Sequence, residues 1–321
     1  MEAAPLADVP RYPAIAGTCL IALGLFAVAT PEQIEPLTVD LRAFWAEPWR
    51  LLTSALLHGG QLRSDQAVTG LIHVGFNVYW LWRLGTPVER RLGHLRTLAL
   101  VVAFAVAGSL LEYAFTGPSV GLSGVVYGFV GLLGVLGRRQ PSWRAVLDRR
   151  TAQFFGFWFG FCVLATLTGA LAIANFAHAG GAILGACVGA AMTREPGKTR
   201  AGAVALTLVL LAAFVAAATL ARPWLNLSRR AGLDAMALAE QAQAEGDLDQ
   251  AIVWAERGVG YWRTPADHWA YLSWLYFAAE RPSDARDALL EAVLRDPENE
   301  AYRAILDQFQ AIARDASEPE R

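Results

Sequence analysis

Residues 121–137 read GLSGVVYGFVGLLGVLG and close a run that carries no charged residue from Tyr113 to Gly137. A helix needs about 20 mainly apolar residues to cross the hydrocarbon core of a bilayer. The run is long enough to do so, and Ser123 stands at the head of its most apolar part. This stretch therefore predicts a membrane-spanning helix with a polar group close to one end.

Further uncharged stretches lie along the chain, at Ala14–Thr30, Gln66–Trp82, Thr97–Leu111, Thr151–Thr193 and Ala201–Ala221. Thr151–Thr193 has room for two helices with a polar break near Asn175. Of the 321 residues, 55% are hydrophobic and the mean hydropathy is +0.34, which is not typical of a soluble domain of this length. The sequence predicts an all-α, polytopic membrane protein with seven spans. No small-residue cleavage pattern follows the first span, so we expect a retained helix rather than a signal peptide.

Basic residues predict the orientation, because they are retained on the cytoplasmic side of a membrane. They follow spans 2, 4 and 6, as Arg83, Arg90, Arg91, Arg96, Arg138, Arg139, Arg144, Arg149, Arg150, Arg194, Lys198 and Arg200. We expect a cytoplasmic N-terminus, an outer loop from Pro31 to about Gly70, and an extracytoplasmic C-terminal part. Arg222, Arg229 and Arg230 oppose this orientation but are outnumbered. Lys198 is the only lysine, which hints at a GC-rich bacterial genome and hence a multi-pass protein of a bacterial inner membrane.

The charge of the chain changes after the last span. Residues 225–321 hold 18 acidic and 10 basic residues, a net charge of −8, whereas residues 1–224 carry a net charge of +6. We therefore predict a cytoplasmic tail at 1–12, a seven-helix membrane domain at 13–222 and a soluble helical domain at 231–316.

The predicted soluble domain contains a repeat. Ala251 and Ala285 occupy corresponding places 34 residues apart, which is the tetratricopeptide period. The second unit resembles the tetratricopeptide pattern at Trp269, Leu272, Tyr276, Ala285, Leu289, Ala292 and Pro297. The first unit, from about Asp234 to Arg263, lacks the proline, and a trailing helix is expected from about Glu300 to Arg314. Such a domain could bind a protein partner, or it could be an ordinary pair of helical hairpins without one.

Two polar residues on different predicted spans could act together. Ser123 and His178 each lie about four residues inside a span that starts at the outer face, so both are expected roughly 6 Å below the outer helix ends. A serine hydroxyl becomes a nucleophile when a base within hydrogen-bond reach takes its proton. The alternative is packing, because small residues form stripes on both spans, at Gly124, Gly128, Gly131, Gly134, Gly181, Gly185 and Gly189.

The second predicted span adds His73 and Asn77, which share one helix face. An amide there could stabilise an oxyanion together with the backbone N–H of Ser123, or the two side chains could simply bond to each other or to loop carbonyls. Glu112 is the only acid inside an apolar stretch and is expected near the outer end of the third span. We therefore expect a Ser–His dyad without an orienting acid. The three cysteines, Cys19, Cys162 and Cys187, are interpreted as small buried side chains.

Residues 1–221 resemble a rhomboid intramembrane serine protease, with a six-helix core and one added C-terminal helix. The motifs that carry the resemblance occur in order: Trp49-Arg50, His73-x-x-x-Asn77, Gly85-x-x-x-Glu89-x-x-x-Gly93, Gly121-Leu122-Ser123-Gly124, and His178 followed by Gly181 and Gly185. The resemblance implies that Ser123 is the nucleophile, His178 the base, and Asn77 and His73 the oxyanion donors, with Gly121 and Gly124 in support.

The same resemblance assigns supporting roles to three other positions. Tyr127 is the ring packed against His178, and Glu89 is a structural residue at the inner end of the second span. Trp49 and Arg50 shape a loop that half-inserts in the outer leaflet, unless they are only an interfacial anchor pair. Rhomboids commonly have a histidine a few residues before the oxyanion histidine, but here His58 lies 15 residues before His73, with Gln61–Gly70 as an apparent insertion. We assign His58 no catalytic role, and His94 and His268 are taken as surface residues.

These expectations amount to an intramembrane endopeptidase that cleaves single-span membrane proteins near the outer face, in contact with the lipid bilayer. They imply no metal, no cofactor and no nucleic-acid partner. A catalytically inactive rhomboid-like protein that binds transmembrane helices is the main alternative. A transporter is disfavoured because the polar groups cluster at one face. A metalloprotease lacks its His-Glu-x-x-His, and a lipase elbow lacks its last glycine, since Val125 stands there.

Overall fold

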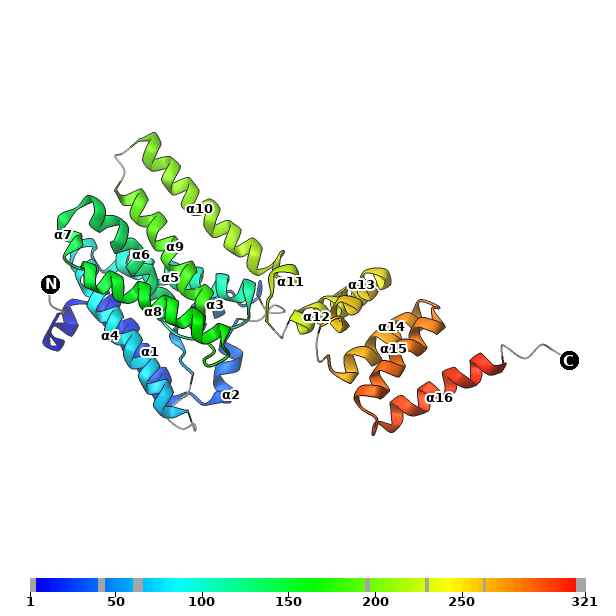
Figure 1. The fold of residues 1–321 in the computed structure, drawn as a ribbon. Coiled ribbons are helices and arrows are strands. Elements are labelled where there is room, and N and C mark those ends of the chain that lie inside the picture. The colour runs from blue at the N-terminus through cyan, green and yellow to red at the C-terminus, as the bar shows by residue number, and fades with distance from the viewer. Residues whose placement is uncertain are drawn as a thin grey trace. The chain divides into compact units, whose positions relative to one another are not determined.

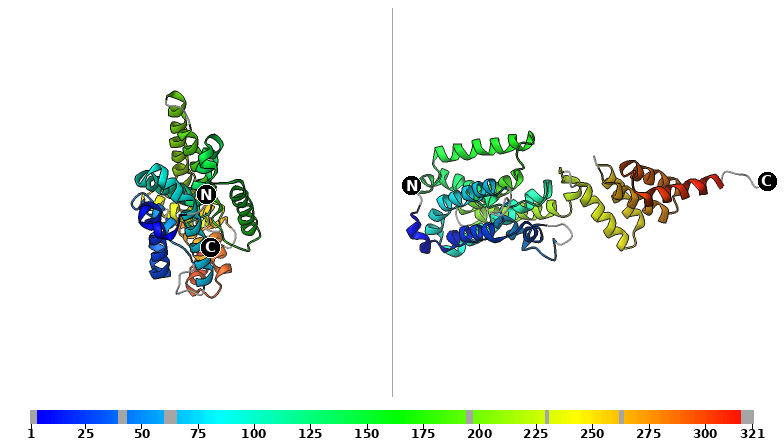
Figure 2. Two further views of the ribbon diagram at one scale, coloured as in Figure 1. Left: turned by 90° about the vertical axis from the view of Figure 1, so that its left-hand side faces the viewer. Right: turned by 90° about the horizontal axis from the view of Figure 1, so that it is seen from below.

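The computed structural model describes residues 4–39, 44–59, 66–193, 197–228, 231–261 and 264–315. Figures 1 and 2 show helices and connecting segments, and the described residues contain no strand. The chain divides into two compact units, Met1–Leu225 and Asn226–Arg321. Several predicted features lie outside the described residues, namely Arg194, Arg229, Arg230, Arg263, residue 316 and residues 61–65 of the apparent insertion.

The elements of the N-terminal unit follow in chain order as η1 (Leu6–Arg11), α1 (Pro13–Val28), α2 (Pro31–Ile34), η2 (Glu35–Leu37), α3 (Arg50–Leu56), α4 (Ala67–Leu92), α5 (His94–Phe115), α6 (Ser123–Arg139), α7 (Pro141–Arg144), α8 (Arg149–Leu167), α9 (Asn175–Met192), α10 (Lys198–Ala218) and α11 (Arg222–Leu225). Each predicted span coincides for most of its length with a different helix, α1, α4, α5, α6, α8, α9 or α10. By length and composition, α5, α9 and α10 can cross a membrane, and α1 is a shorter apolar helix. The predicted break near Asn175 is confirmed, because α8 ends at Leu167 and α9 begins at Asn175.

The predicted start of the fourth span is wrong. Residues up to Phe115 belong to α5, and α6 begins only at Ser123. The intervening segment contains Pro118, and the residue before a proline is disfavoured in the α region. Gly121 then has a φ of +123°, a backbone conformation that side chains other than glycine rarely adopt. An uncharged run therefore contained both a helix end and a turn.

Helices α6 and α9 lie side by side and pack backbone against backbone (Figure 1). A Cβ atom added at Gly181 would overlap the carbonyl oxygen of Gly124, and one added at Gly185 would overlap that of Gly128. Small residues at such an interface let two helices approach closely, so that van der Waals contacts form between them. These contacts stabilise helix association in lipid, where the hydrophobic effect does not drive helices together. In contrast, α8 lies at the margin of this unit (Figure 2), and only Phe155, Cys162 and Ala165 of it are buried.

The far end of α4 is fixed by the second predicted motif. Gly85 leaves room for the side chain of Ile15 on α1, and Gly93 makes the turn into α5 with a φ of +83°. The buried carboxylate of Glu89 accepts hydrogen bonds of 2.9 Å from the backbone N–H groups of Ala14 and Ile15. Nδ1 of the exposed His94 lies 2.7 Å from the same carboxylate. Glu89 is thus a structural residue, as predicted.

The C-terminal unit consists of α12 (Ala231–Ala244), α13 (Leu248–Val259), α14 (Ala266–Ala278), α15 (Pro282–Arg295) and α16 (Glu300–Asp315). Two helical hairpins form, α12 with α13 and α14 with α15. Their turns contain Gly246 at a φ of +82° and Glu280 at +58°. Ala251 and Ala285 are both completely buried, and His268 is half-buried in α14. The two hairpins therefore repeat the same kind of turn and the same buried alanine.

Candidate active site

Ser123 is the first residue of α6. It therefore lies about one turn closer to the start of its helix than predicted. The first backbone bond of the helix runs from the N–H of Val126 to the carbonyl of Leu122. The N–H of Ser123 precedes this ladder, as the first N–H groups of every helix do, so it can serve a ligand. The hydroxyl and a free amide donor thus belong to the same residue.

His178 is the fourth residue of α9, which is the position along the helix predicted for it, and its side chain is buried. Its ring stacks on that of Tyr127, with centroids 4.5 Å apart and an interplanar angle of 18°. The predicted contact between these two rings is therefore confirmed. Tyr127 lies one turn after Ser123, so the two residues share a face of α6. That face consequently presents both the hydroxyl and the platform for the imidazole.

Among the residues that the structure describes, no carboxylate is bonded to the imidazole of His178. Within the described part of the chain its Nδ1 has no hydrogen-bond partner, and no bond joins it to the hydroxyl of Ser123. Catalytic hydrogen bonds are often long before substrate binds, so this geometry is compatible with a base. Ring stacking, rather than an acid, fixes the plane of this imidazole.

A polar cluster from α4 and the segment after α3 lies against the turn that precedes Ser123. A Cβ atom added at Gly121 would lie 2.9 Å from two ring atoms of His73 and 3.5 Å from Nδ2 of Asn77. Asn77 is buried, and its Nδ2 lies 3.1 Å from Nε2 of His58. The amide nitrogen can only donate, so Nε2 of His58 accepts and its proton resides on Nδ1. One amide hydrogen of Asn77 remains for another acceptor.

His58 belongs to this polar cluster. Sequence reasoning set it aside, but its buried ring contacts Asn77 and lies edge-on to His73, with centroids 5.0 Å apart. The apparent insertion lengthens the connection to α4 without removing His58 from the cluster. The available signal was its place directly after α3, since α3 also supplies the carbonyl of Ser54 that binds the N–H of Gly121.

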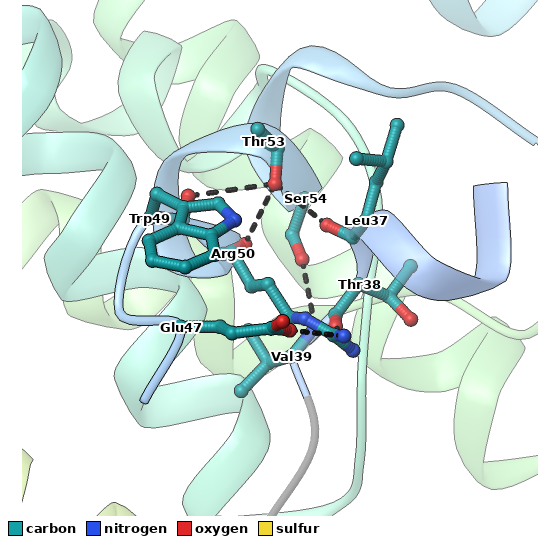
Figure 3. Close-up of polar contacts among 8 residues, drawn as sticks. All are labelled: Leu37, Thr38, Val39, Glu47, Trp49, Arg50, Thr53 and Ser54. Carbon is teal, nitrogen blue, oxygen red and sulfur yellow. Dashed lines mark hydrogen bonds and ion pairs between the residues drawn. The ribbon is translucent and has the colours of Figure 1, made fainter. Parts of the chain in front are cut away.

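Trp49 is the N-cap residue of α3 and Arg50 is its first residue, and the two differ in what they contact (Figure 3). Arg50 forms an ion pair with Glu47 and donates to the carbonyl of Thr38 at 3.3 Å. Thr53 donates to the carbonyl of Leu37 at 2.7 Å, which ties the same loop to the helix. The side chain of Trp49 is about half exposed, at 54%. Arg50 thus shapes this loop, and Trp49 is available to the surroundings.

The cysteines and the potential metal ligands do not form a second reactive site among the residues that the structure describes. All three cysteines are free, with Cys19 and Cys162 buried and Cys187 half-buried. Among the residues that the structure describes, no three His, Cys, Asp or Glu side chains gather as a metal site would require.

Comparison with known proteins gives matches to the part of the chain that holds this site. Residues 46–195 match the family model described as the Rhomboid domain. The rhomboid protease GlpG of Yersinia pseudotuberculosis serotype I (strain IP32953) is 34% identical over 155 residues, which are 47% of this chain and 50% of that protein. Rhomboid protease GlpG of Serratia proteamaculans (strain 568) is 34% identical over 138 residues, 43% and 45% of the two chains.

The chain therefore spans about half the length of the curated relatives it matches. The two findings agree with each other and support the rhomboid family for residues 46–195. The matched region contains α3 to α9, and with them Ser123, His178, Tyr127, Asn77, His73 and His58, but it does not reach the C-terminal unit.

Proposed function

We propose that this protein is an intramembrane serine endopeptidase in which Ser123 is the nucleophile and His178 the base. The observation that carries the proposal is the stacking of His178 on Tyr127, one turn beyond Ser123 on the same face of α6. The match of residues 46–195 to the rhomboid domain supports the same reaction class.

The reaction follows from the chemistry of these groups. Oγ of Ser123 attacks the scissile carbonyl while His178 takes its proton, and His178 then delivers that proton to the leaving amine as the C–N bond breaks. Water next attacks the resulting ester, again with His178 as base, and releases the acid and the free serine. The N–H of Ser123, the second amide hydrogen of Asn77 and the ring of His73 would stabilise the oxyanion. His58 would hold the Asn77 amide in the required orientation.

Single-span membrane proteins are the proposed substrates, cleaved near the outer face of a bacterial inner membrane. The site lies where α6 and α9 begin, and the distribution of basic residues supports an outer position for these helix ends. A regular helix keeps its carbonyls hydrogen-bonded, so a substrate must unwind locally before attack. Residues that weaken helices near the cleavage position would favour this.

Labelling with a fluorophosphonate probe tests the proposed chemistry, because such probes modify activated serines. The full-length protein should be labelled, and the Ser123→Ala and His178→Ala variants should not. Ser119→Ala is the matched control, since Ser119 lies in the turn before α6, and it should be labelled like the wild type. Labelling that persists in Ser123→Ala would contradict the assignment. An unlabelled wild type that still binds transmembrane helices would favour the inactive rhomboid-like alternative.

The C-terminal unit is proposed to be a tetratricopeptide-like domain that binds a protein partner. The 34-residue spacing of its two buried alanines and its repeated turns support this. Deletion of residues 231–321 should then reduce cleavage of the native substrate without reducing fluorophosphonate labelling of Ser123. Equal cleavage by both proteins would count against a role for this unit in substrate recognition.

A further inference from the structure

The helix that carries His178 does not cap its own N-terminus. Ala174 occupies the cap position of α9 and offers no side-chain acceptor. The first N–H groups of a helix have no partner within the helix, and buried ones need an acceptor from elsewhere. For α9 that acceptor comes from α5: Oε2 of Glu112 accepts the N–H of Ala177 at 2.9 Å, and Glu112 is buried.

Glu112 is itself held in place. The hydroxyl of Thr116, one turn further along, donates to Oε1 of Glu112 at 2.5 Å. The neighbouring ring of Phe115 stacks on that of Phe176, with centroids 4.5 Å apart and an angle of 11° between the planes. The last turn of α5 therefore contacts two consecutive residues of α9, Phe176 through the ring stack and Ala177 through the hydrogen bond.

The carbonyl side of Ala177 is enclosed as tightly as its N–H. Cβ atoms added at Gly108 of α5 and Gly124 of α6 would lie 3.1 Å and 3.2 Å from the oxygen of Ala177. Ala177 is thus fixed from both sides, and the next residue in the chain is His178. If this peptide shifted along α5, the imidazole of His178 would shift with it. The stack on Tyr127 would not prevent this, because stacking constrains the plane of the ring more than its position along the helix axis.

From this arrangement we propose that Glu112 is the positioning residue that sets the depth of His178 beside Ser123, acting through the backbone of α9. A carboxylate also suits the N-terminus of a helix electrostatically. Glu112 does not act as the third member of a triad, since Nδ1 of His178 has no hydrogen-bond partner within the described part of the chain. The inference rests on the proposed function, because it assigns Glu112 a task in activating Ser123.

The test measures the saturable rate of fluorophosphonate labelling, kinact, and the half-saturating probe concentration, KI, on the full-length protein in detergent. Glu112→Ala should lower kinact by about 10- to 100-fold and leave KI unchanged, because a small misplacement of a catalytic group has effects of this size. Glu112→Gln should restore most of kinact, since its amide oxygen can still accept the N–H of Ala177. Ser109→Ala is the control, because Ser109 lies one turn earlier on α5 and donates to the carbonyl of Leu51, away from α9.

The outcomes separate the two proposals. No labelling of the wild type would refute the proposed function itself. Normal labelling of the wild type together with an unchanged kinact for Glu112→Ala, or an equal loss in Ser109→Ala, would overturn the role of Glu112 alone. If Glu112→Ala does not fold, Thr116→Val replaces it, because it frees the carboxylate without removing it. A smaller drop in kinact at constant KI is then expected, and no drop would overturn the inference.

Discussion

Helix starts in the two units are capped in different ways. In the N-terminal unit, α1 and α9 receive carboxylates from Glu89 and Glu112, which are 75 and 65 residues away from the N–H groups they accept. In the C-terminal unit, α13 is capped by its own preceding residue, Asp247, which accepts the N–H of Gln250. A buried helix start has no water to satisfy it, so an acceptor must come from another element. An exposed start can use the residue next to it.

Burial, rather than the unit, explains the difference. Helix α8 belongs to the N-terminal unit, yet Asp148 immediately before it caps the N–H of Thr151 at 2.8 Å. Asp148 is exposed, like Asp247, whereas Glu89 and Glu112 are buried. Packing shows the same contrast between distant and local contacts. Gly124 and Gly181 are far apart in the sequence but pack against each other, whereas the buried alanines of the C-terminal hairpins lie between helices that are consecutive in the chain.

The largest expected effect comes from breaking the distant packing contact. In Gly181→Leu the new side chain would overlap the backbone carbonyl of Gly124. The backbones of α6 and α9 are closely packed at this point and cannot move aside. We expect loss of folded protein in detergent, measured by size-exclusion chromatography, and loss of fluorophosphonate labelling. Gly160→Leu on α8 is the matched control, because that position faces open space and should tolerate the change. Equal behaviour of the two variants would contradict backbone-to-backbone packing.

Removal of a buried distant cap should come next. Glu89→Ala leaves two buried N–H groups without acceptors, at about 1–3 kcal/mol each, so we expect a loss of about 2–6 kcal/mol in the free energy of unfolding. Reversible unfolding in mixed micelles measures this. His94→Ala is the control, since it removes the exposed partner but keeps both amide bonds to Glu89. A loss in Glu89→Ala no greater than in His94→Ala would show that the distant cap adds little.

Removal of the local cap in the C-terminal unit should cost less. Asp247→Ala is expected to destabilise α13 by about 1 kcal/mol, the usual value for an N-cap. Hydrogen exchange of the α13 amides measures it, with Asp249→Ala as a control in the first turn of the same helix. Altered exchange in α1 or α9 would be inconsistent with a local effect.

The smallest effect is a pH dependence at Asp148. Its hydrogen bond with the backbone of Thr151 lowers the pKa of the Asp148 carboxyl below the ordinary 3.8. A lowered pKa adds stability above the ordinary value, and this contribution is lost as the pH falls through the folded-state pKa. Between roughly pH 5 and pH 2.5, Asp148→Asn should therefore show a slightly flatter fall of melting temperature than the wild type, because its amide caps without titrating. Parallel curves would argue against a titrating cap.

What could be predicted from the sequence follows the same division between local and distant contacts. Uncharged runs located the long helices, and the break before Asn175 was visible in the residues themselves. The start of α6 was misplaced, because Pro118 and Gly121 end one element inside a run that is uniformly uncharged. His58 and Glu112 were not given their places, since their partners Asn77 and Ala177 are 19 and 65 residues away. Composition carries no information about which distant residues meet.

The peptide of Ala177 has a consequence for how this protein could be redesigned. Helices α5 and α6 contact it at Gly108, Glu112 and Gly124, and the two glycine positions already have the smallest residue available. Ordinary cores tolerate a larger side chain at one position when a neighbouring side chain becomes smaller. That compensation is not possible here, because no residue is smaller than glycine. A library that varies this junction should therefore return glycine at both positions, while the surrounding aliphatic positions of the same helices diversify.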